Sequence, residues 1–113
     1  MHELGIMMHI VSQMEDYMKE HQLTKMGSLT IEIGEISGIV PSYLYDIYPL
    51  AIEGSILEGA ELVIEEIKAK GLCKKCHYVF DLVKHEGHCP KCHEKNYKIL
   101  SGAEFNIKQI TAY

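Results

Sequence analysis

The first segment of the chain repeats apolar residues at the spacing of a helix. Its apolar positions fall three or four residues apart, at Leu4, Met7, Met8, Val11, Met14 and Met18, while acidic residues and lysine lie largely on the other side. Side chains spaced in this way share one face of an α-helix. The pattern predicts an amphipathic helix over about residues 3–21 that packs through its apolar face.

Three later segments alternate apolar and polar residues, which is the period of a half-buried β-strand. The apolar members are Leu29, Ile31 and Ile33 in residues 28–34, Leu62 and Ile64 in residues 60–67, and Phe105 and Ile107 in residues 104–111. Each segment is therefore predicted to be a strand with one face toward a core.

A second helix is predicted from about Pro41, a residue suited to the first turn of a helix because its missing N–H costs nothing there. The apolar stripe of this helix consists of Leu44, Ile47, Leu50 and Ala51. Pro49 lies within the stripe and cannot donate to the carbonyl of Tyr45, so we expect it to kink or split the helix.

The order of these elements predicts an α+β fold in which two helices pack on a three-stranded sheet. A cysteine-rich segment separates the second and third strands, and we expect it to be an inserted zinc-ribbon module whose ends lie at adjacent strands. The predicted domains are residues 1–70 plus 101–113, the α+β domain, and residues 71–100, the inserted domain.

Charge divides the chain in the same way. The 113 residues carry a formal net charge of -5. Residues 71–100 hold six lysines and three acidic residues, a balance of +3, and the remainder holds five lysines and thirteen acidic residues, a balance of -8. A small basic module is therefore expected on an acidic body.

Composition also excludes several classes of function. All eleven basic residues are lysine, and arginine, which supplies many contacts to bases and phosphates, is absent, so we expect no nucleic-acid partner. No apolar run approaches the roughly 20 residues of a membrane span, and the opening MHELGIMMHI lacks the positive leader of an export signal. We expect a cytoplasmic protein. No phosphate loop, nucleophile elbow or Ser/His/Asp pattern supports an enzyme.

Two C-x-x-C pairs, Cys73 with Cys76 and Cys89 with Cys92, are separated by twelve residues. Four thiolates with this spacing can close tetrahedrally on Zn²⁺, which leaves no vacancy for catalysis. Disulfides are a second interpretation, disfavoured in a reducing cytoplasm. A rubredoxin-like iron site uses similar pairs. Each pair also precedes a histidine and so matches the c-type haem signature C-x-x-C-H, although covalent haem needs an oxidising compartment.

His77 and His93 follow the two cysteine pairs symmetrically. They are either solvated residues of a polar module or alternative ligands, able to replace a cysteine or to bind a second metal. The sequence leaves both interpretations open.

The N-terminal Met1-His2-Glu3 has the donors of a metal chelate. The Met1 amine, the deprotonated His2 amide and the His2 imidazole place three nitrogens in a plane, and Glu3 or a distant imidazole can provide a fourth donor. This set suits Ni²⁺ or Cu²⁺. By itself the pattern is weak, since a histidine at the second position is usually a surface residue.

The opening MHEL, the first helix, EIGEISG, EGAEL before the second strand and the paired C-x-x-C motifs together resemble the HypA/HybF family. Members of that family are nickel metallochaperones that mature [NiFe]-hydrogenases, and some also supply urease. The similarity extends in order over nearly the whole chain. Two departures are Pro49 in the second helix and Gly5, where a serine is more usual.

The resemblance implies an N-terminal nickel site centred on His2, with Met1 and Glu3 contributing, and a structural zinc at Cys73, Cys76, Cys89 and Cys92. It implies as partners a HypB-type GTPase, the hydrogenase large-subunit precursor and, where urease is a client, its accessory proteins. The chain is expected to be a monomer or a homodimer. The alternative is a zinc-ribbon adaptor that binds protein or nucleic acid without carrying nickel.

Overall fold

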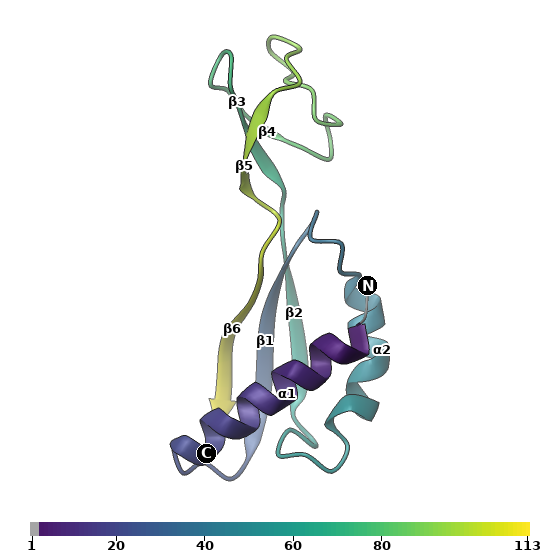
Figure 1. Cartoon of the computed structure of the whole chain (residues 1–113), viewed down its shortest axis with the longest axis vertical. Coiled ribbons are helices and arrows are strands. Elements are labelled where there is room, and N and C mark those ends of the chain that lie inside the picture. Colours follow the sequence, from purple (N-terminus) through teal and green to yellow (C-terminus); the bar gives the residue numbers. More distant parts are fainter. Residues whose placement is uncertain (1–2) are drawn as a thin grey trace.

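Residues 3–113, which the computed structural model describes, form two helices and six strands (Figure 1). In chain order these elements are α1 (Glu3–Glu20), β1 (Met26–Gly34), α2 (Pro41–Ile52), β2 (Glu61–Ile67), β3 (Lys70–Cys73), β4 (Val79–Asp81), β5 (Tyr97–Ser101) and β6 (Phe105–Ala112). The predicted α+β class is confirmed. β3 and β5 were not anticipated, because their short segments show no clear alternation.

The body contains a three-stranded sheet of order β2-β1-β6. β1 pairs in parallel with β2, with Leu29 opposite Leu62, and antiparallel with β6, with Leu29 opposite Ile110. The parallel pair needs a crossover, and α2 provides it. The expectation that the inserted module joins adjacent strands is wrong, because its ends continue from β2 and into β6, and β1 lies between them.

Helix α1 crosses one face of this sheet, and α2 lies beside α1 next to β2 (Figure 1). The buried face of α1 consists of Met7, Ile10, Val11, Met14 and Met18. Leu4 and Met8, which the pattern placed on that face, are 45% and 50% exposed. Successive residues turn by about 100° around a helix, so Met8 points to the flank while its neighbour Met7 is fully buried.

Helix α2 is not split by Pro49, and a split was one of the two outcomes expected of this residue, the other being a kink. It is continuous from Pro41 to Ile52 because the proline falls in the last turn, where few hydrogen bonds remain to be lost. Its apolar face also differs from the predicted one, since Leu50 is 65% exposed and Tyr48 is buried.

Two tyrosines of α2 attach it to the neighbouring strand. The buried Tyr48 hydroxyl donates to the Ala60 carbonyl at 3.0 Å, and the Ile64 N–H donates to the Tyr45 hydroxyl at 3.0 Å. The second bond satisfies a backbone donor on β2, which is an edge strand. These bonds fix the helix against the outer edge of the sheet.

The cysteine-rich segment forms a second sheet of order β4-β3-β5, which projects from one end of the body (Figure 1). The strand predicted over residues 78–82 is present as β4. The molecule is therefore elongated, with extents of 54 × 26 × 17 Å.

A tightly packed joint connects the two sheets. A Cβ on Gly34 would overlap the Gly102 carbonyl, and one on Gly102, whose φ is +107°, would overlap Ala69. The Glu35 carboxylate accepts a hydrogen bond from the Ala69 N–H at 3.0 Å and lies 3.6 Å from Lys68 Nζ. The joint therefore fixes the direction in which the module leaves the body.

Candidate metal centres

Four cysteine sulfurs meet at the far end of the module. The Sγ atoms of Cys73, Cys76, Cys89 and Cys92 all lie within 4.8 Å of one another. Two of the separations are 3.5 Å, between Cys73 and Cys92, and 3.6 Å, between Cys76 and Cys89. A tetrahedral site with metal–sulfur bonds of about 2.3 Å requires sulfurs about 3.8 Å apart. The cluster thus fits a tetrahedral metal ion and is too open for disulfide bonds, which need about 2.05 Å.

Each cysteine pair forms the same backbone knuckle. The His77 N–H donates to the Cys73 carbonyl at 3.0 Å, and the His93 N–H donates to the Cys89 carbonyl at 2.8 Å. The backbone of both histidines adopts the left-handed conformation, with φ of +64° at His77 and +65° at His93. The repeated turn brings the two sulfurs of each pair to the same side, which explains why the C-x-x-C spacing was sufficient to predict the cluster.

The backbone of the knuckles favours thiolate at the first cysteine of each pair. N–H groups, chiefly that of Cys76, lower the pKa of the Cys73 thiol to about 6. Burial opposes ionisation at Cys89, but the N–H groups of Cys92 and Lys91 bring its pKa below the ordinary value.

The pKa of the Cys92 thiol is shifted in the opposite direction. The Glu94 N–H favours the Cys92 thiolate, but burial and the three neighbouring sulfurs raise the pKa of Cys92 to about 12. Four thiolates this close repel one another, so full deprotonation needs a cation at their centre. The donor set and its electrostatics therefore suit a divalent metal.

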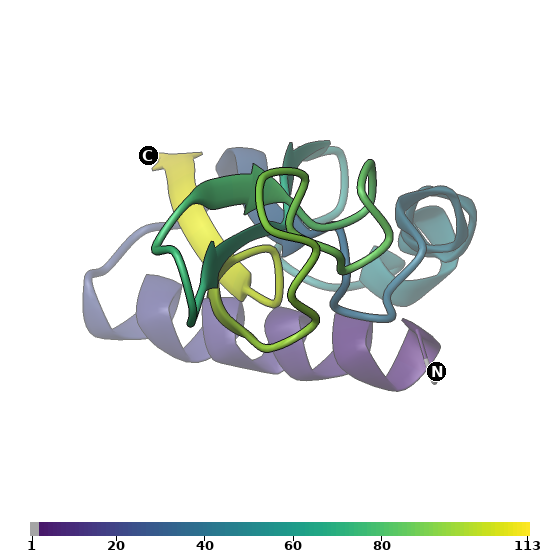
Figure 2. The same cartoon turned by 90° about the horizontal axis from the view of Figure 1, so that it is seen from above.

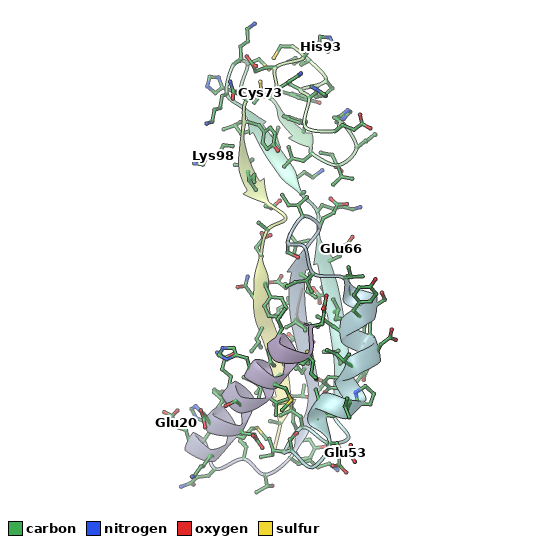
Figure 3. The ribbon with its side chains drawn as sticks, turned by 45° about the vertical axis from the view of Figure 1, so that its right-hand side comes forward. Glu20, Glu53, Glu66, Cys73, His93 and Lys98 are labelled. Atoms are coloured by element: carbon green, nitrogen blue, oxygen red, sulfur yellow. The ribbon has the colours of Figure 1, made fainter. Side chains whose placement is uncertain are left out.

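His77 and His93 lie on the surface beside the cluster, and Figure 3 shows His93 at the outer end of the module. Among residues 3–113, the group close enough to hold one ion consists of the four cysteines, without either histidine. Lys91 adds positive charge near the knuckles and lies 5.3 Å from the ring centroid of Tyr78. The proposed ligand exchange by these histidines stays a prediction.

Of the predicted nickel ligands, Met1 and His2 lie outside the described residues. Glu3 is the first residue of α1 and is partly exposed. Two perpendicular views place the start of α1 beside α2 (Figures 1 and 2). The module projects away from the start of α1, so Glu3 and the four-cysteine cluster lie in different parts of the molecule.

Comparison with known proteins decides the family. A protein-family model described as hydrogenase/urease nickel incorporation, metallochaperone, hypA, matches residues 1–112. The chain belongs to the HypA family. A hydrogenase maturation factor HypA from Chlorobium limicola is 34% identical over 111 residues, which are 98% of this chain and 96% of that one. Another from Psychromonas ingrahamii is 39% identical over 77 residues, 68% of each chain.

Solved HypA structures share the fold. The solution structure of the Ni metallochaperone HypA from Helicobacter pylori has a TM-score of 0.68 and 28% identity, and the match covers 99% of this chain and 97% of that one. Another HypA solution structure has a TM-score of 0.74 and 29% identity over 100% of this chain and 97% of that one. HypA proteins are metallochaperones and maturation factors rather than enzymes. Within residues 3–113, no helix has the length and apolarity to cross a membrane.

Two acidic residues have a place in the structure that no sequence pattern marked. Glu35 lies in the joint between body and module, where its carboxylate accepts a hydrogen bond from the Ala69 N–H. Asp46 shares a cleft with Glu3 between α1 and α2. No local pattern marks Asp46, because the cleft forms between two helices that are far apart in the sequence.

Proposed function

We propose that this HypA-family chain binds Ni²⁺ at its N-terminus and delivers it during [NiFe]-hydrogenase maturation, with urease as a further client. The nickel ligands are the Met1 amine, the amide and imidazole of His2, and Glu3. The observation that carries the proposal is the Met-His-Glu opening in a chain of a nickel-incorporation family. Three nitrogen donors with an oxygen donor form a tetragonal site of the kind Ni²⁺ takes.

The four cysteines hold Zn²⁺ in this proposal, and the metal has a structural role. The near-tetrahedral sulfur cluster supports it. A closed four-thiolate site has no open position, so it does not take part in nickel transfer. Residues 71–100 act as the zinc domain and residues 1–70 with 101–113 as the nickel-binding domain.

Nickel transfer takes place in the cytoplasm by ligand exchange with partner proteins. The partners are a HypB-type GTPase, the hydrogenase large-subunit precursor and, for urease, its accessory proteins. Cu²⁺ binds nitrogen sites more tightly than Ni²⁺ does, so availability and docking of partners provide the metal selectivity. The carrier acts as a monomer or a homodimer.

The test is calorimetric titration of the zinc-loaded chain with Ni²⁺. His2→Ala is expected to abolish nickel binding, because it removes the imidazole donor. An N-terminal extension, which converts the Met1 amine to an amide, is expected to do the same. His21→Ala, at an exposed histidine just beyond α1, is the matched control and should bind nickel normally.

Zinc content, measured by elemental analysis, should stay near one ion per chain in all these proteins. Unchanged nickel binding in both His2→Ala and the extended chain would refute the N-terminal site and leave a zinc-ribbon adaptor as the better interpretation. If elemental analysis found iron in place of zinc, the assignment of Zn²⁺ to the four cysteines would be refuted.

The histidines beside the cluster need a separate measurement. If His77 or His93 exchanges into the zinc site, the zinc-edge X-ray absorption spectrum of wild type will change with pH or metal load. The spectrum of the His77→Ala/His93→Ala variant will not show that change. Identical spectra of the two proteins under every condition would refute ligand exchange.

A further inference from the structure

The two edges of the body sheet differ in how they are covered. The outer edge of β2 is held by α2, where the Tyr45 hydroxyl accepts the Ile64 N–H at 3.0 Å. β6 forms the other edge, and within residues 3–113 no strand pairs with its outer side. Figure 1 shows β6 on the outside of the body, away from α2. An unpaired edge of this kind is a template for a further strand.

One backbone hydrogen bond shows which groups of β6 point outward. The Gly34 N–H donates to the Glu104 carbonyl at 2.7 Å, so the backbone polar groups of Glu104 point toward β1. The antiparallel register of β1 with β6 is regular from Phe105 to Ile107. Hydrogen-bonded and non-hydrogen-bonded positions alternate along such a pair. Asn106 therefore bonds to β1, and the N–H and C=O groups of Phe105 and Ile107 point outward.

The usual features that protect an edge strand come only after these two residues. Proteins prevent pairing at exposed edges with lysine, with proline or with a β-bulge. β6 contains no proline, and its lysine is Lys108. The register shift in its pairing with β1 falls between Ile107 and Gln109. Residues 105–107 are thus left open to pairing.

An apolar groove runs beside this part of the edge. Its volume is about 770 Å³, and Ile6 and Ile10 of α1 line it together with Phe105 and Ile107 of β6. A strand added to β6 places every second side chain on the face that carries the groove. The site therefore suits an extended segment with apolar residues two positions apart.

The segment at the start of β6 is complementary to itself. It reads Glu-Phe-Asn-Ile-Lys, with an acid at one end, a base at the other and an apolar residue on each side of Asn106. In an antiparallel pair centred on Asn106, Phe105 of each copy lies opposite Ile107 of the other. Glu104 likewise lies opposite Lys108. Apolar pairs and opposite charges at facing positions stabilise antiparallel strands.

The outward backbone groups fit the same register. Asn106 points toward β1 in each copy, so the two asparagines form a non-hydrogen-bonded pair at the two-fold axis. Phe105 of one copy and Ile107 of the other then form a hydrogen-bonded pair, which exchanges both N–H···O bonds. Both side chains lie on the groove side of the sheet, so each copy fills the groove of the other.

The uneven charge of the chain favours a second copy as the occupant. The module precedes Glu104 in the chain and β6 continues past Lys108, so an antiparallel pair turns each module toward the partner's body. Residues 71–100 carry a balance of +3 and the remainder carries -8. The module stays positive with the proposed zinc, because Zn²⁺ and four thiolates together add only two negative charges. Complementary charge of this kind orients association.

We propose that the free edge of β6 pairs with β6 of a second copy, antiparallel about Asn106, and that the chain forms a homodimer with one continuous sheet. The interface is isologous, so every contact occurs twice. This inference goes beyond the proposed function, because it assigns an interface and involves none of the nickel ligands.

Sedimentation equilibrium of the zinc-loaded full chain tests the dimer. Wild type should associate reversibly to twice the mass of the chain as its concentration rises. Lys108→Glu and Glu104→Lys, each alone, replace two pairs of opposite charge by two pairs of like charge and should weaken dimerisation about tenfold. Lys84→Glu, at an exposed lysine beyond β4, changes the net charge as Lys108→Glu does and should associate like wild type.

An equimolar mixture of the two interface variants tests the register. Each copy of Lys108→Glu then meets a copy of Glu104→Lys with opposite charges at both ends, so the mixture should associate about as tightly as wild type. Circular dichroism checks that each variant is folded. A mixture of folded variants that associates no better than either alone would overturn the proposal. So would a wild type that stays monomeric at every concentration, which would leave the edge to an extended segment of another protein.

Hydrogen exchange of the wild-type chain gives a measurement that needs no variant. The N–H groups of Phe105 and Ile107 should exchange rapidly in dilute protein and become protected as the dimer forms. The Asn106 N–H, which points toward β1, should be protected at all concentrations. Rapid exchange of Phe105 and Ile107 in a protein that has associated would place the interface elsewhere and overturn the proposal.

Discussion

Glu35 bonds to three successive residues, Ile67, Lys68 and Ala69, in the joint between body and module. Its carboxylate accepts the N–H of Ala69, which is fully buried, and its backbone N–H donates to Ile67 at 2.8 Å. The ion pair with Lys68 adds little, because that lysine side chain is 65% exposed. Glu35 thus stabilises the fold mainly by satisfying a buried backbone donor.

Two substitutions distinguish these contributions. Glu35→Ala leaves the Ala69 N–H without a partner and should lower the free energy of unfolding by about 1–3 kcal/mol. Glu35→Gln keeps an acceptor oxygen and loses only the weak ion pair, so its cost should be about 0.5 kcal/mol or less. Urea denaturation of the zinc-loaded proteins measures both. Equal losses in the two variants would show that charge, rather than the hydrogen bond, stabilises the joint.

At the scale of elements, α2 shows how packing changes a face predicted from spacing. Of the predicted apolar stripe, Leu44 and Ala51 are buried, but Leu50 is exposed. Tyr48, which was not assigned to the stripe, is buried in the core. Tyr48 can be buried because its hydroxyl finds the Ala60 carbonyl. The partner is a backbone group beyond the helix, so the helical pattern alone could not reveal it.

Burial raises the pKa of Tyr48 to about 12, whereas an unfolded tyrosine has a pKa near 10. The folded state therefore holds this proton more tightly, and stability is full below pH 10 and falls as pH rises through 12. The loss should reach about 2–3 kcal/mol. Denaturation between pH 9 and 12 should show a shallower decline for Tyr48→Phe than for wild type. Tyr43→Phe, at an exposed tyrosine, should match wild type, and equal slopes in all three would contradict the prediction.

At the scale of the whole molecule, the chain is far from spherical. Its radius of gyration is 17.6 Å, compared with about 13 Å for a compact domain of this length. Figure 3 shows Cys73 near the far end of the module, while Glu20 and Glu53 mark the opposite end of the body. Within residues 3–113, the core of the body contains sixteen buried residues. The module core contains five, and two of those are cysteines.

This difference predicts how the molecule responds to loss of metal. With so small a core, the module should depend for its folding on the zinc ion proposed for the four cysteines, whereas the body should stay folded. Small-angle scattering of the zinc-loaded chain should give a radius of gyration close to 17.6 Å. After chelation, the module should expand while the helical circular dichroism of α1 and α2 persists. Loss of the helical signal together with the metal would show that body and module fold as one unit.

The sequence by itself predicted both helices, the three strands of the body and the clustering of the four cysteines, because these features depend on local spacing. Apolar periodicity specifies a helix or a strand, and two C-x-x-C pairs form knuckles through backbone bonds of their own. Only the tertiary structure decided the order β2-β1-β6, the joint of Gly34, Glu35 and Gly102, and the cleft that Glu3 and Asp46 both line. These features join residues far apart in the chain, and which distant surfaces meet is set by packing of the whole core, which no local pattern records.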